Sequence, residues 1–530
     1  MSRELLAREA LGQIPKILTL QDRNPHSPTY GCFDRNFWHY KILDFPSGMA
    51  QELVWPLALA WSTELPGNPF HGAAAVRDWI VAGVRYAAAS AHADGSCDDY
   101  FPHERAAGAA AFSLLACLES YELVGLDDEP LRRFFAARAD WLAAHEESGR
   151  LSNHHALTVL ALARLGRLLG TDRWREAGAR RLERLLQWQS AEGWFQEYDG
   201  CDPGYHTLTL GCLAQLHDLH PSAQLEEALE RAIGFAAEMV HPDGSYGGEI
   251  GSRNTFNFFP HGFEVAGRWA PHALAVNDGF LAGLAAGRGP CHADDHILGH
   301  HAWSYLLAWR HWVPQRPAPA PRRSGRVWLS EARILIERRE DTELYAALGK
   351  GGVFKLFRGG ELVASDTQVS LRVGCGSRAR NAVAHLMDAY RIQLADDEIS
   401  VRGSLGWAKQ ARMTPPRLLA LRVLALSIGR FAPNLLRRFL QRLLITGKRT
   451  APFTFARTFA WQAGRWLIRD EVSGPSWEDV RGAGIGGHQT SIHVVMSRTY
   501  EPGQLVPWRD LTPEVGRLGP GEALRIERSV

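Results

Sequence analysis

The sequence lacks the features that mark membrane-spanning and secreted proteins. It contains no run of about 18 uncharged apolar residues, so a helix that crosses a bilayer is not expected. The stretch from Met1 to Leu20 begins with charged residues and has neither the apolar core nor the cleavage site of a secretory signal peptide. We therefore expect a cytoplasmic protein, with a peripheral position on the inner membrane as the alternative.

Cysteine is scarce as well. The seven cysteines among 530 residues are scattered, and none has the C-x-x-C spacing of a metal site. Reduced, structural cysteines are therefore expected, and a disulfide scaffold is excluded. Hydrophobic residues make up 45% and charged residues 22% of the chain, which is ordinary for a folded protein. No nucleic-acid-binding motif is visible, so we expect no nucleic-acid partner.

Acidic residues are missing from one long segment. Between Ile399 and Arg469 there is no Asp or Glu, whereas 14 Lys and Arg occur. Because the whole chain has a formal net charge of +1, the remainder carries −13. The near-zero total would by itself argue against membranes and polyanions, but the charge is segregated along the chain, and that exclusion does not hold.

The first 312 residues have helical periodicity and a repeated turn. Gly-containing polar turns recur at Gly95, Gly149, Gly193 and Gly244, with steps of 54, 44 and 51 residues. A period near 50 that carries two helices predicts stacked helical hairpins. Closed into a ring, such hairpins form an (α/α) toroid and bring residues about 50 positions apart to one end of the ring. An open helical solenoid is the alternative.

A composition change separates this region from the rest. The linker 313–325 is rich in proline, which no helix tolerates. From 326 to 530 short alternating segments with Gly turns predict an antiparallel β-sandwich. The fold class is therefore multidomain α + β, with a toroid over 1–312.

One helical insertion, 414–447, interrupts the β pattern. It is split by Pro433 and Asn434, and its second half has leucines and a phenylalanine on one face and arginines on the other. This cationic amphipathic hairpin, centred on 415–447, predicts contact with an anionic membrane or a partner protein. A lid that grips a polyanion and a solvated face without function are the alternatives.

Three polar clusters hold residue types suited to catalysis. Ser152 to His155 opens a helical stretch, where its Ser or Asn could equally be the N-cap. Glu197 to His206 gathers acids and two tyrosines around an Asp-Pro-Gly turn, with Tyr205 as a packed helix cap in the alternative interpretation. Gly247 to Glu264 is a polar yet aromatic loop that packing alone explains poorly.

A helical toroid, a Pro-rich linker and a β-rich domain together resemble the heparinase II/III-like and alginate-lyase-like polysaccharide lyases. That family carries an Asn-Asn-His-Gly type motif on an inner helix and a catalytic Tyr further along. Here Asn153 and His154 match the middle of the motif, and Tyr205 follows His154 by 51 residues. The resemblance covers the whole architecture, although Ser152 and His155 replace the first Asn and the Gly.

The resemblance implies β-elimination on a uronic-acid-containing anionic polysaccharide or oligosaccharide. The uronate carboxylate must be neutralised while charge develops beside it. Asn153, helped by Arg253 or Asn254, is the expected group for this step. His154 or Tyr205 then removes the C5 proton, depending on the uronate stereochemistry, and Tyr205 protonates the departing oxygen.

The family also uses a further histidine. His261 is the first choice, and His385 and His488 in the β-rich domain are alternatives. The other polar residues of the three clusters are expected to bind substrate: His155, Glu197, Tyr198, Asp202, Asn254, Asn257 and Glu264.

No cofactor is predicted with certainty. Some relatives hold zinc or calcium in the β-rich domain, so a divalent metal stays an open alternative. The nearest grouping in this sequence, His292-Ala-Asp-Asp-His296, is explained equally well as a polar helix end.

Two other functions compete with the lyase. A toroid glycoside hydrolase would use paired carboxylates from Glu197, Asp199, Asp202 and Glu249. A non-catalytic glycan-binding or assembly protein of exopolysaccharide biosynthesis at the membrane face would use neither mechanism. The product separates the two enzymes, because a lyase forms an unsaturated uronate that absorbs in the near UV.

Overall fold

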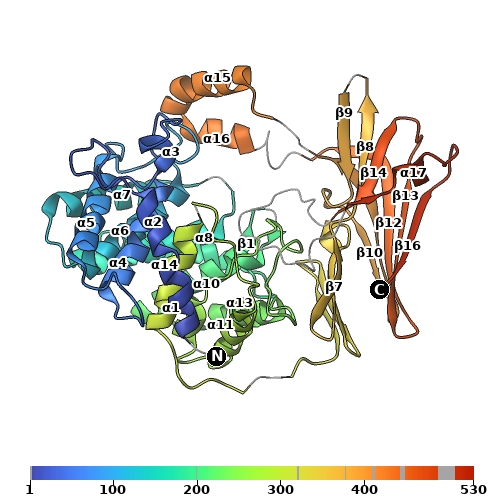
Figure 1. Ribbon diagram of the computed structural model, residues 1–530, viewed down its shortest axis with the longest axis horizontal. Coiled ribbons are helices and arrows are strands. Elements are labelled where there is room, and N and C mark those ends of the chain that lie inside the picture. Colours follow the sequence, from blue (N-terminus) through green and yellow to red (C-terminus); the bar gives the residue numbers. More distant parts are fainter. Residues whose placement is uncertain are drawn as a thin grey trace.

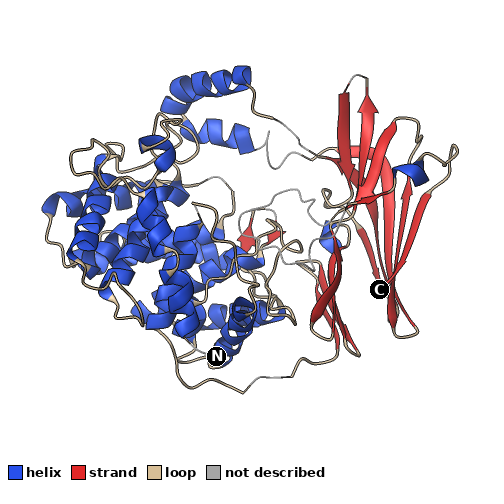
Figure 2. Cartoon of the chain, in the orientation of Figure 1, coloured by secondary structure: helices blue, strands red, loops and turns tan. Residues whose placement is uncertain are grey.

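The protein consists of a helical part and two large β-sheets (Figures 1 and 2), and a two-stranded sheet of β1 (Gln196–Glu197) and β2 (Gly200–Cys201) lies in a loop of the helical part. The structure is a computed structural model that describes residues 3–147, 149–198, 200–295, 297–318, 321–376, 378–408, 412–441, 448–486 and 508–530. Asp199, His296, His488 and the segment 442–447 lie outside these ranges.

Six inner helices form a closed ring in the helical part. Each contacts the next, and the last, α14, contacts the first, α4. The ring therefore closes, which confirms the predicted toroid and rules out the open solenoid. In order, the inner helices are α4 (Val54–Ser62), α6 (Ala107–Leu123), α8 (Ser152–Leu169), α10 (Pro203–Leu219), α12 (His261–Ala266) and α14 (Leu298–Arg310).

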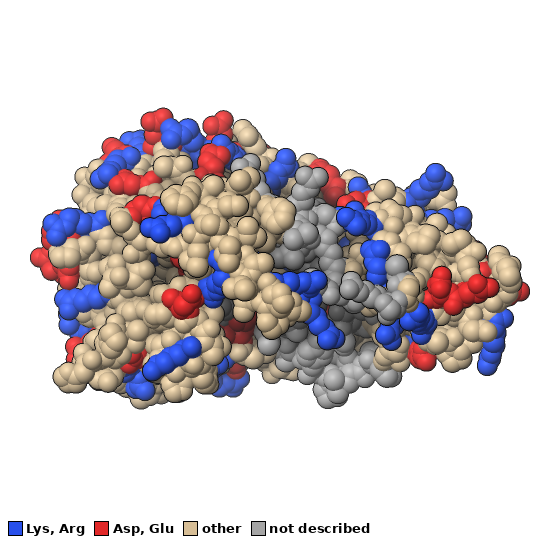
Figure 3. Space-filling view, turned by 90° about the horizontal axis from the view of Figure 1, so that it is seen from above, with Lys and Arg blue, Asp and Glu red and all other residues tan. Residues whose placement is uncertain are grey.

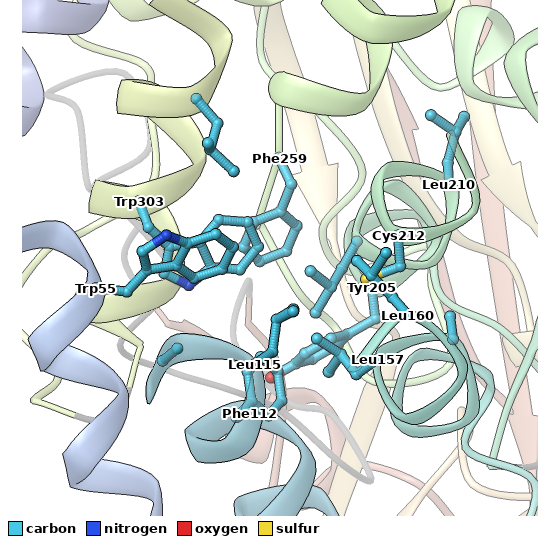
Figure 4. Close-up of a cluster of buried hydrophobic side chains, with 14 of the residues drawn as sticks. Trp55, Phe112, Leu115, Leu157, Leu160, Tyr205, Leu210, Cys212, Phe259 and Trp303 are labelled. Carbon is cyan, nitrogen blue, oxygen red and sulfur yellow. The ribbon is translucent and has the colours of Figure 1, made fainter. Parts of the chain in front are cut away.

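The outer helices alternate with the inner ones along the chain. The inner helices are buried on nearly every side because they are built from Ala, Gly and Leu, whereas the outer helices expose a charged face. Figure 4 shows Trp55, Phe259 and Trp303 stacked inside the ring. The outer helices are α5 (Ala74–Ala89), α7 (Glu129–Ala144), α9 (Arg175–Gln187), α11 (Ala223–Glu238) and α13 (His272–Ala285), and α1 (Glu4–Leu11), α2 (Ile14–Leu20) and α3 (Arg35–Trp38) precede the ring.

The repeated glycine turns have a common packing reason. Gly95, Gly193 and Gly244 all have a positive φ, between 80° and 99°. A Cβ at these positions would lie 2.1–2.4 Å from the backbone of α7, α11 and α13, respectively. Only glycine allows this approach, so each turn fixes an outer helix against the preceding hairpin.

The first β-sheet is an antiparallel meander buried on both faces. Side chains alternate, so Ile336 and Tyr345 join the helical core, whereas Leu335 and Leu344 face the second sheet. This sheet therefore connects the toroid to the rest of the β-rich part. Its strands, in spatial order, are β3 (Gly325–Leu329), β4 (Ile334–Arg339), β5 (Thr342–Ala347), β6 (Val353–Arg358) and β7 (Glu361–Asp366).

The second sheet packs on the outer face of the first and completes the predicted antiparallel sandwich. Its order is β15-β14-β8-β9-β11-β12-β13-β16, with β10 paired to β11. Arg457 is fully buried in the sandwich between Asp366 and Asp470. The strands are β8 (Val369–Cys375), β9 (Arg378–Val383), β10 (Arg391–Leu394), β11 (Glu398–Trp407), β12 (Thr450–Gln462), β13 (Arg465–Ser473), β14 (Val480–Ile485), β15 (Arg509–Asp510) and β16 (Leu524–Ser529), with a short helix α17 (Thr512–Val515).

The helical insertion leaves the second sheet between β11 and β12. It comprises α15 (Pro415–Leu424), a π-helical segment (Ala425–Gly429) and α16 (Pro433–Gln441), so the predicted hairpin and its break beside Pro433 are confirmed. Figure 1 places it above the toroid, next to α3. There Arg422 forms an ion pair of 2.9 Å with Asp44.

The described part of the chain can be inspected for cysteine pairing and for long apolar helices. Six cysteines are free thiols, five of them buried. No helix among the described residues has the length and apolar character needed to cross a bilayer.

Candidate functional site

The first cluster is tied to the second by hydrogen bonds at the start of α8. Leu151 is the N-cap and makes no side-chain cap, while the Ser152 hydroxyl donates to the Gln196 carbonyl at 2.7 Å. The Asn153 backbone N–H and side-chain Nδ2 donate to Glu197 Oε1 at 2.9 and 2.8 Å. The interpretation of Ser152 or Asn153 as a helix cap is therefore wrong. The Oδ1 atom of Asn153 is buried and has no hydrogen-bond partner among the described residues.

Glu197 is fully buried between an amide and a guanidinium. Its Oε2 atom lies 3.8 Å from Arg253 Nη1. Burial raises the pKa of Glu197 to about 7, against the opposing effects of Arg253 and the Asn153 hydrogen bonds. A large fraction of Glu197 is consequently neutral near pH 7.

Arg253 stacks on two tyrosines. Its guanidinium carbon lies 4.1 Å from the ring centre of Tyr205 and 4.9 Å from that of Tyr198. Burial raises the pKa of Tyr205 to about 12, and the nearby positive charge of Arg253 opposes this rise. The arginine thus stabilises any negative charge that develops on the Tyr205 oxygen.

Asp202 positions both members of this stack. It is the N-cap of α10, accepting from the Tyr205 N–H at 2.9 Å, and it also accepts from the Arg253 N–H at 3.2 Å and from the Thr255 hydroxyl. The expected Asp-Pro-Gly turn is instead the first turn of α10, because Asp suits the N-cap and Pro203 suits the first helical position. Asp202 therefore acts as an organiser of the site.

A carboxylate fixes the orientation of the His154 ring, and a glycine on a neighbouring helix leaves room for it. Its Nδ1 lies 2.7 Å from Glu147 Oε2. If Nδ1 carries the hydrogen, Nε2 is left as a proton acceptor. A Cβ at Gly108 of α6 would lie 2.4 Å from the ring, so glycine makes the room that the imidazole occupies. His154 packs edge-on to Phe112, and the Tyr205 ring points toward the same phenylalanine (Figure 4).

Two asparagines of the third cluster are buried, and some of their polar atoms have no partner within the part of the chain that the structure describes. These atoms are Oδ1 of Asn254 and both side-chain polar atoms of Asn257. Asn254 also has a φ of 60°, in the left-handed region that asparagine tolerates better than most residues. Unpaired buried amides are rare, and a bound ligand or water would satisfy them.

Three predicted site residues make contacts typical of packing between helices. His155 lies against Trp188, and burial lowers its pKa to about 3. His261 forms a 2.8 Å hydrogen bond with Ser304, and burial lowers its pKa to about 3. Both carboxylate oxygens of Glu264 accept hydrogen bonds from Arg316.

The first sheet reaches the third cluster through two lysines that sequence reasoning missed. Lys350 donates to the carbonyls of Glu249 and Gly251 at 2.6 and 2.8 Å, and burial lowers its pKa to about 8. Lys355 lies 3.3 Å from the Glu249 carboxylate. His385 is buried and bonds the Thr367 carbonyl. The lysines lie about 100 residues from their partners, so no local pattern reveals these contacts.

No group of three or more metal-ligating side chains occurs within the described ranges. In the His292 to His296 segment, Asp295 forms ion pairs with Arg35 at 2.9 Å and with Lys16 at 3.9 Å. Asp295 of this grouping is therefore paired with two cationic side chains, while His296 lies outside the described residues.

Some solved structures are similar to this chain, each at low sequence identity. No protein-family profile and no curated protein sequence matches the chain. Among solved structures, a heparinase III matches with 11% identity and a TM-score of 0.44, covering 91% of this chain and 71% of its own. A chondroitin AC lyase from Streptomyces coelicolor matches with 10% identity and a TM-score of 0.48, covering 92% and 69%. A heparin-specific unsaturated glucuronyl hydrolase matches with 8% identity and a TM-score of 0.39, covering 58% and 96%. The first two are polysaccharide lyases by name, the class that the sequence resembles.

Proposed function

We propose that this protein is a polysaccharide lyase that cleaves a uronic-acid-containing glycan by β-elimination. One observation carries the proposal. Asn153, Glu197, Arg253 and Tyr205 form one connected polar set, in which Asn153 binds Glu197, Glu197 lies near Arg253, and Arg253 stacks on the Tyr205 ring. Elimination needs a neutralised carboxylate and proton transfer at one place, and this set supplies both.

Neutralisation of the uronate carboxylate is assigned to Asn153 and Arg253. The Oδ1 of Asn153, which has no hydrogen-bond partner among the described residues, can only accept, so it binds a uronate carboxyl group that has taken up a proton. Neutral Glu197 supplies that proton and is left ionised beside Arg253. Glu197 repels the substrate carboxylate little, because its raised pKa of about 7 keeps much of it protonated. The guanidinium of Arg253 then stabilises the enediolate-like charge as the C5 proton leaves.

Proton transfer is assigned to His154 and Tyr205. The Glu147–His154 pair holds the imidazole with one nitrogen able to accept the C5 proton. Tyr205, whose pKa of about 12 keeps its hydroxyl protonated, donates to the departing glycosidic oxygen. Where the stereochemistry puts C5–H on the tyrosine face, Tyr205 first gives its hydroxyl proton to His154. The tyrosinate, stabilised by Arg253, then takes the C5 proton and passes it to the departing oxygen.

Access to these groups requires movement. Asn153 is fully buried and Tyr205 is 8% exposed. The loop from Gly247 to Asn257 is held against the first sheet by Lys350 and Lys355. Substrate binding therefore involves a shift of this loop or of the first sheet, and the closed state keeps water from the reacting atoms.

A glycoside hydrolase mechanism is less well supported. Its acids would be a pair facing a sugar ring. Asp202 is occupied as a helix cap, Glu249 faces Lys355, and Glu197 is held by Asn153 and Arg253. Asp199 lies outside the described residues.

The test is product formation from purified protein. We expect a product that absorbs in the near UV from at least one of alginate, heparan-type or bacterial uronate polysaccharides. Tyr205→Phe keeps the ring under Arg253 but removes the hydroxyl, so turnover should fall about 10³-fold. Tyr246→Phe, at another buried tyrosine of the toroid, is the matched control.

Loss of activity in Tyr205→Phe but not in Tyr246→Phe supports the assignment. Products with new reducing ends but no near-UV absorption would show that the protein is a hydrolase and would contradict the lyase assignment. No product from any of these polysaccharides would favour a non-catalytic glycan-binding or assembly protein.

A further inference from the structure

The helical insertion exposes apolar side chains on an unusual scale. Nine of the fourteen large apolar residues that are exposed among the described residues lie within residues 412–441, here called the hairpin surface. Phe431 is 84% exposed and Leu419 is 66% exposed. Isolated exposed apolar residues are normal, but a concentration of this kind indicates contact with another apolar phase. The nine are Met413, Leu418, Leu419, Val423, Leu426, Ile428, Phe431, Leu435 and Phe439.

The charge of the same surface has one sign. Residues 412–441 contain six arginines and no acidic residue. Arg422 forms an ion pair with Asp44 of the toroid, which anchors the hairpin. Arg417 and Arg430 are exposed and form no ion pair with a described residue. The hairpin surface is therefore apolar and also carries at least two exposed arginines, Arg417 and Arg430, with no ion pair to a described residue.

The hairpin surface lies on one side of the molecule. Figure 1 shows α15 and α16 at the top of the molecule, away from the second sheet and above the toroid. Figure 3 looks down on this side and shows a broad uncharged area beside the grey atoms, with charged side chains of both signs around it. Tyr40 and Ile42 are also exposed, in the loop just before Asp44.

We propose that the hairpin surface docks the protein on the face of a bilayer that contains anionic phospholipid. Its apolar side chains enter the boundary between headgroups and acyl chains, and its arginines pair with the lipid phosphates. A glycan held under a lid would satisfy the arginines, but it would leave apolar side chains such as Phe431 in water. A bilayer surface satisfies both kinds of side chain at once.

The test is co-sedimentation of the full chain with vesicles. Vesicles of phosphatidylcholine with phosphatidylglycerol are compared with vesicles of phosphatidylcholine alone. We expect at least tenfold tighter binding to the anionic vesicles. Phe431→Ser with Phe439→Ser should weaken this binding at least tenfold. Arg417→Gln with Arg430→Gln should weaken it about 25-fold, since each Lys or Arg near an anionic surface contributes about fivefold.

Matched controls come from exposed residues elsewhere. Val363→Ser replaces an exposed apolar residue of β7, and Arg175→Gln replaces an arginine whose side chain is 79% exposed. Both should bind like the parent chain.

Equal binding to neutral and anionic vesicles, or undiminished binding of the Phe431 and Phe439 double variant, would overturn the proposal. Absence of binding to either vesicle would also overturn it and leave a protein partner for this surface. These outcomes do not depend on whether the lyase assignment holds.

Discussion

The candidate site and the hairpin surface depart from the usual distribution of polar and apolar side chains in opposite directions. At the site, polar groups such as Asn153 and Glu197 are buried, and some of their atoms lack partners. On the hairpin surface, apolar groups such as Phe431 are exposed to water. Both arrangements cost stability in the isolated protein. The comparison indicates that each region is built for a partner of its own kind, one polar and one apolar.

Replacing Arg253 should have a large effect on the polar region, comparable with that of Tyr205→Phe. Arg253→Gln removes the positive charge from the Tyr205 ring and from Glu197, so we expect kcat/KM on the active polysaccharide to fall by about 10²–10³. Vesicle binding should stay unchanged. Arg175→Gln is the control. If Arg253→Gln retains full activity, Arg253 takes no part in the reaction.

Glu197 should make stability depend on pH. Its pKa in the folded protein is about 7, above the value of about 4.3 expected in the unfolded chain. Below about pH 4.3 both states are protonated. As the pH rises toward 7, the unfolded chain ionises first, and the folded state loses about 3 kcal/mol relative to it.

Glu197→Gln cannot ionise, so its stability relative to the parent chain should increase by about 3 kcal/mol between about pH 4.5 and about pH 8. Denaturant unfolding of both proteins at the two pH values measures this difference. A constant difference, or one of opposite sign, would show that Glu197 is ionised in the folded protein.

Gly108 offers a smaller test of the geometry around His154. The Cβ of Gly108→Ala would lie 2.4 Å from the imidazole and should displace it, lowering kcat/KM about tenfold. Gly234→Ala in α11, where nothing lies within 4 Å of the added Cβ, is the control and should gain up to about 1 kcal/mol in stability. Equal activity of the two variants would place His154 outside the reaction.

The smallest effect on activity is expected when the hairpin surface is changed and the candidate site is left intact. Phe431→Ser with Phe439→Ser should leave kcat/KM on dissolved polysaccharide within about twofold of the parent, because a surface made for a bilayer contributes nothing to a soluble substrate. A fall of tenfold or more in kcat/KM would show that the hairpin takes part in catalysis and acts as a lid over the site.

The sequence predicted the features that depend on local pattern. The glycine turns around Gly95 and Gly193 indicated the toroid, and the break beside Pro433 indicated two helices in the insertion. The start of α10 was misjudged, since Asp-Pro-Gly suits a turn and a helix N-terminus equally well.

The supporting contacts of the site could not be predicted. Gly108 makes room for His154 from another helix, and Glu147 belongs to the segment after α7. Lys350 reaches the carbonyls beside Glu249 from a sheet that follows the linker. Each of these contacts depends on how elements pack in three dimensions, and hydrophobic periodicity carries no information about it.

The account depends most on the claim that the protein cleaves its glycan by elimination. Mass spectrometry of the products formed in ¹⁸O-labelled water tests this claim directly. Elimination predicts fragments whose masses sum to that of the starting oligosaccharide, with no label from water and a double bond in the new non-reducing residue. Fragments that together gain one labelled water would contradict the account and identify a hydrolase.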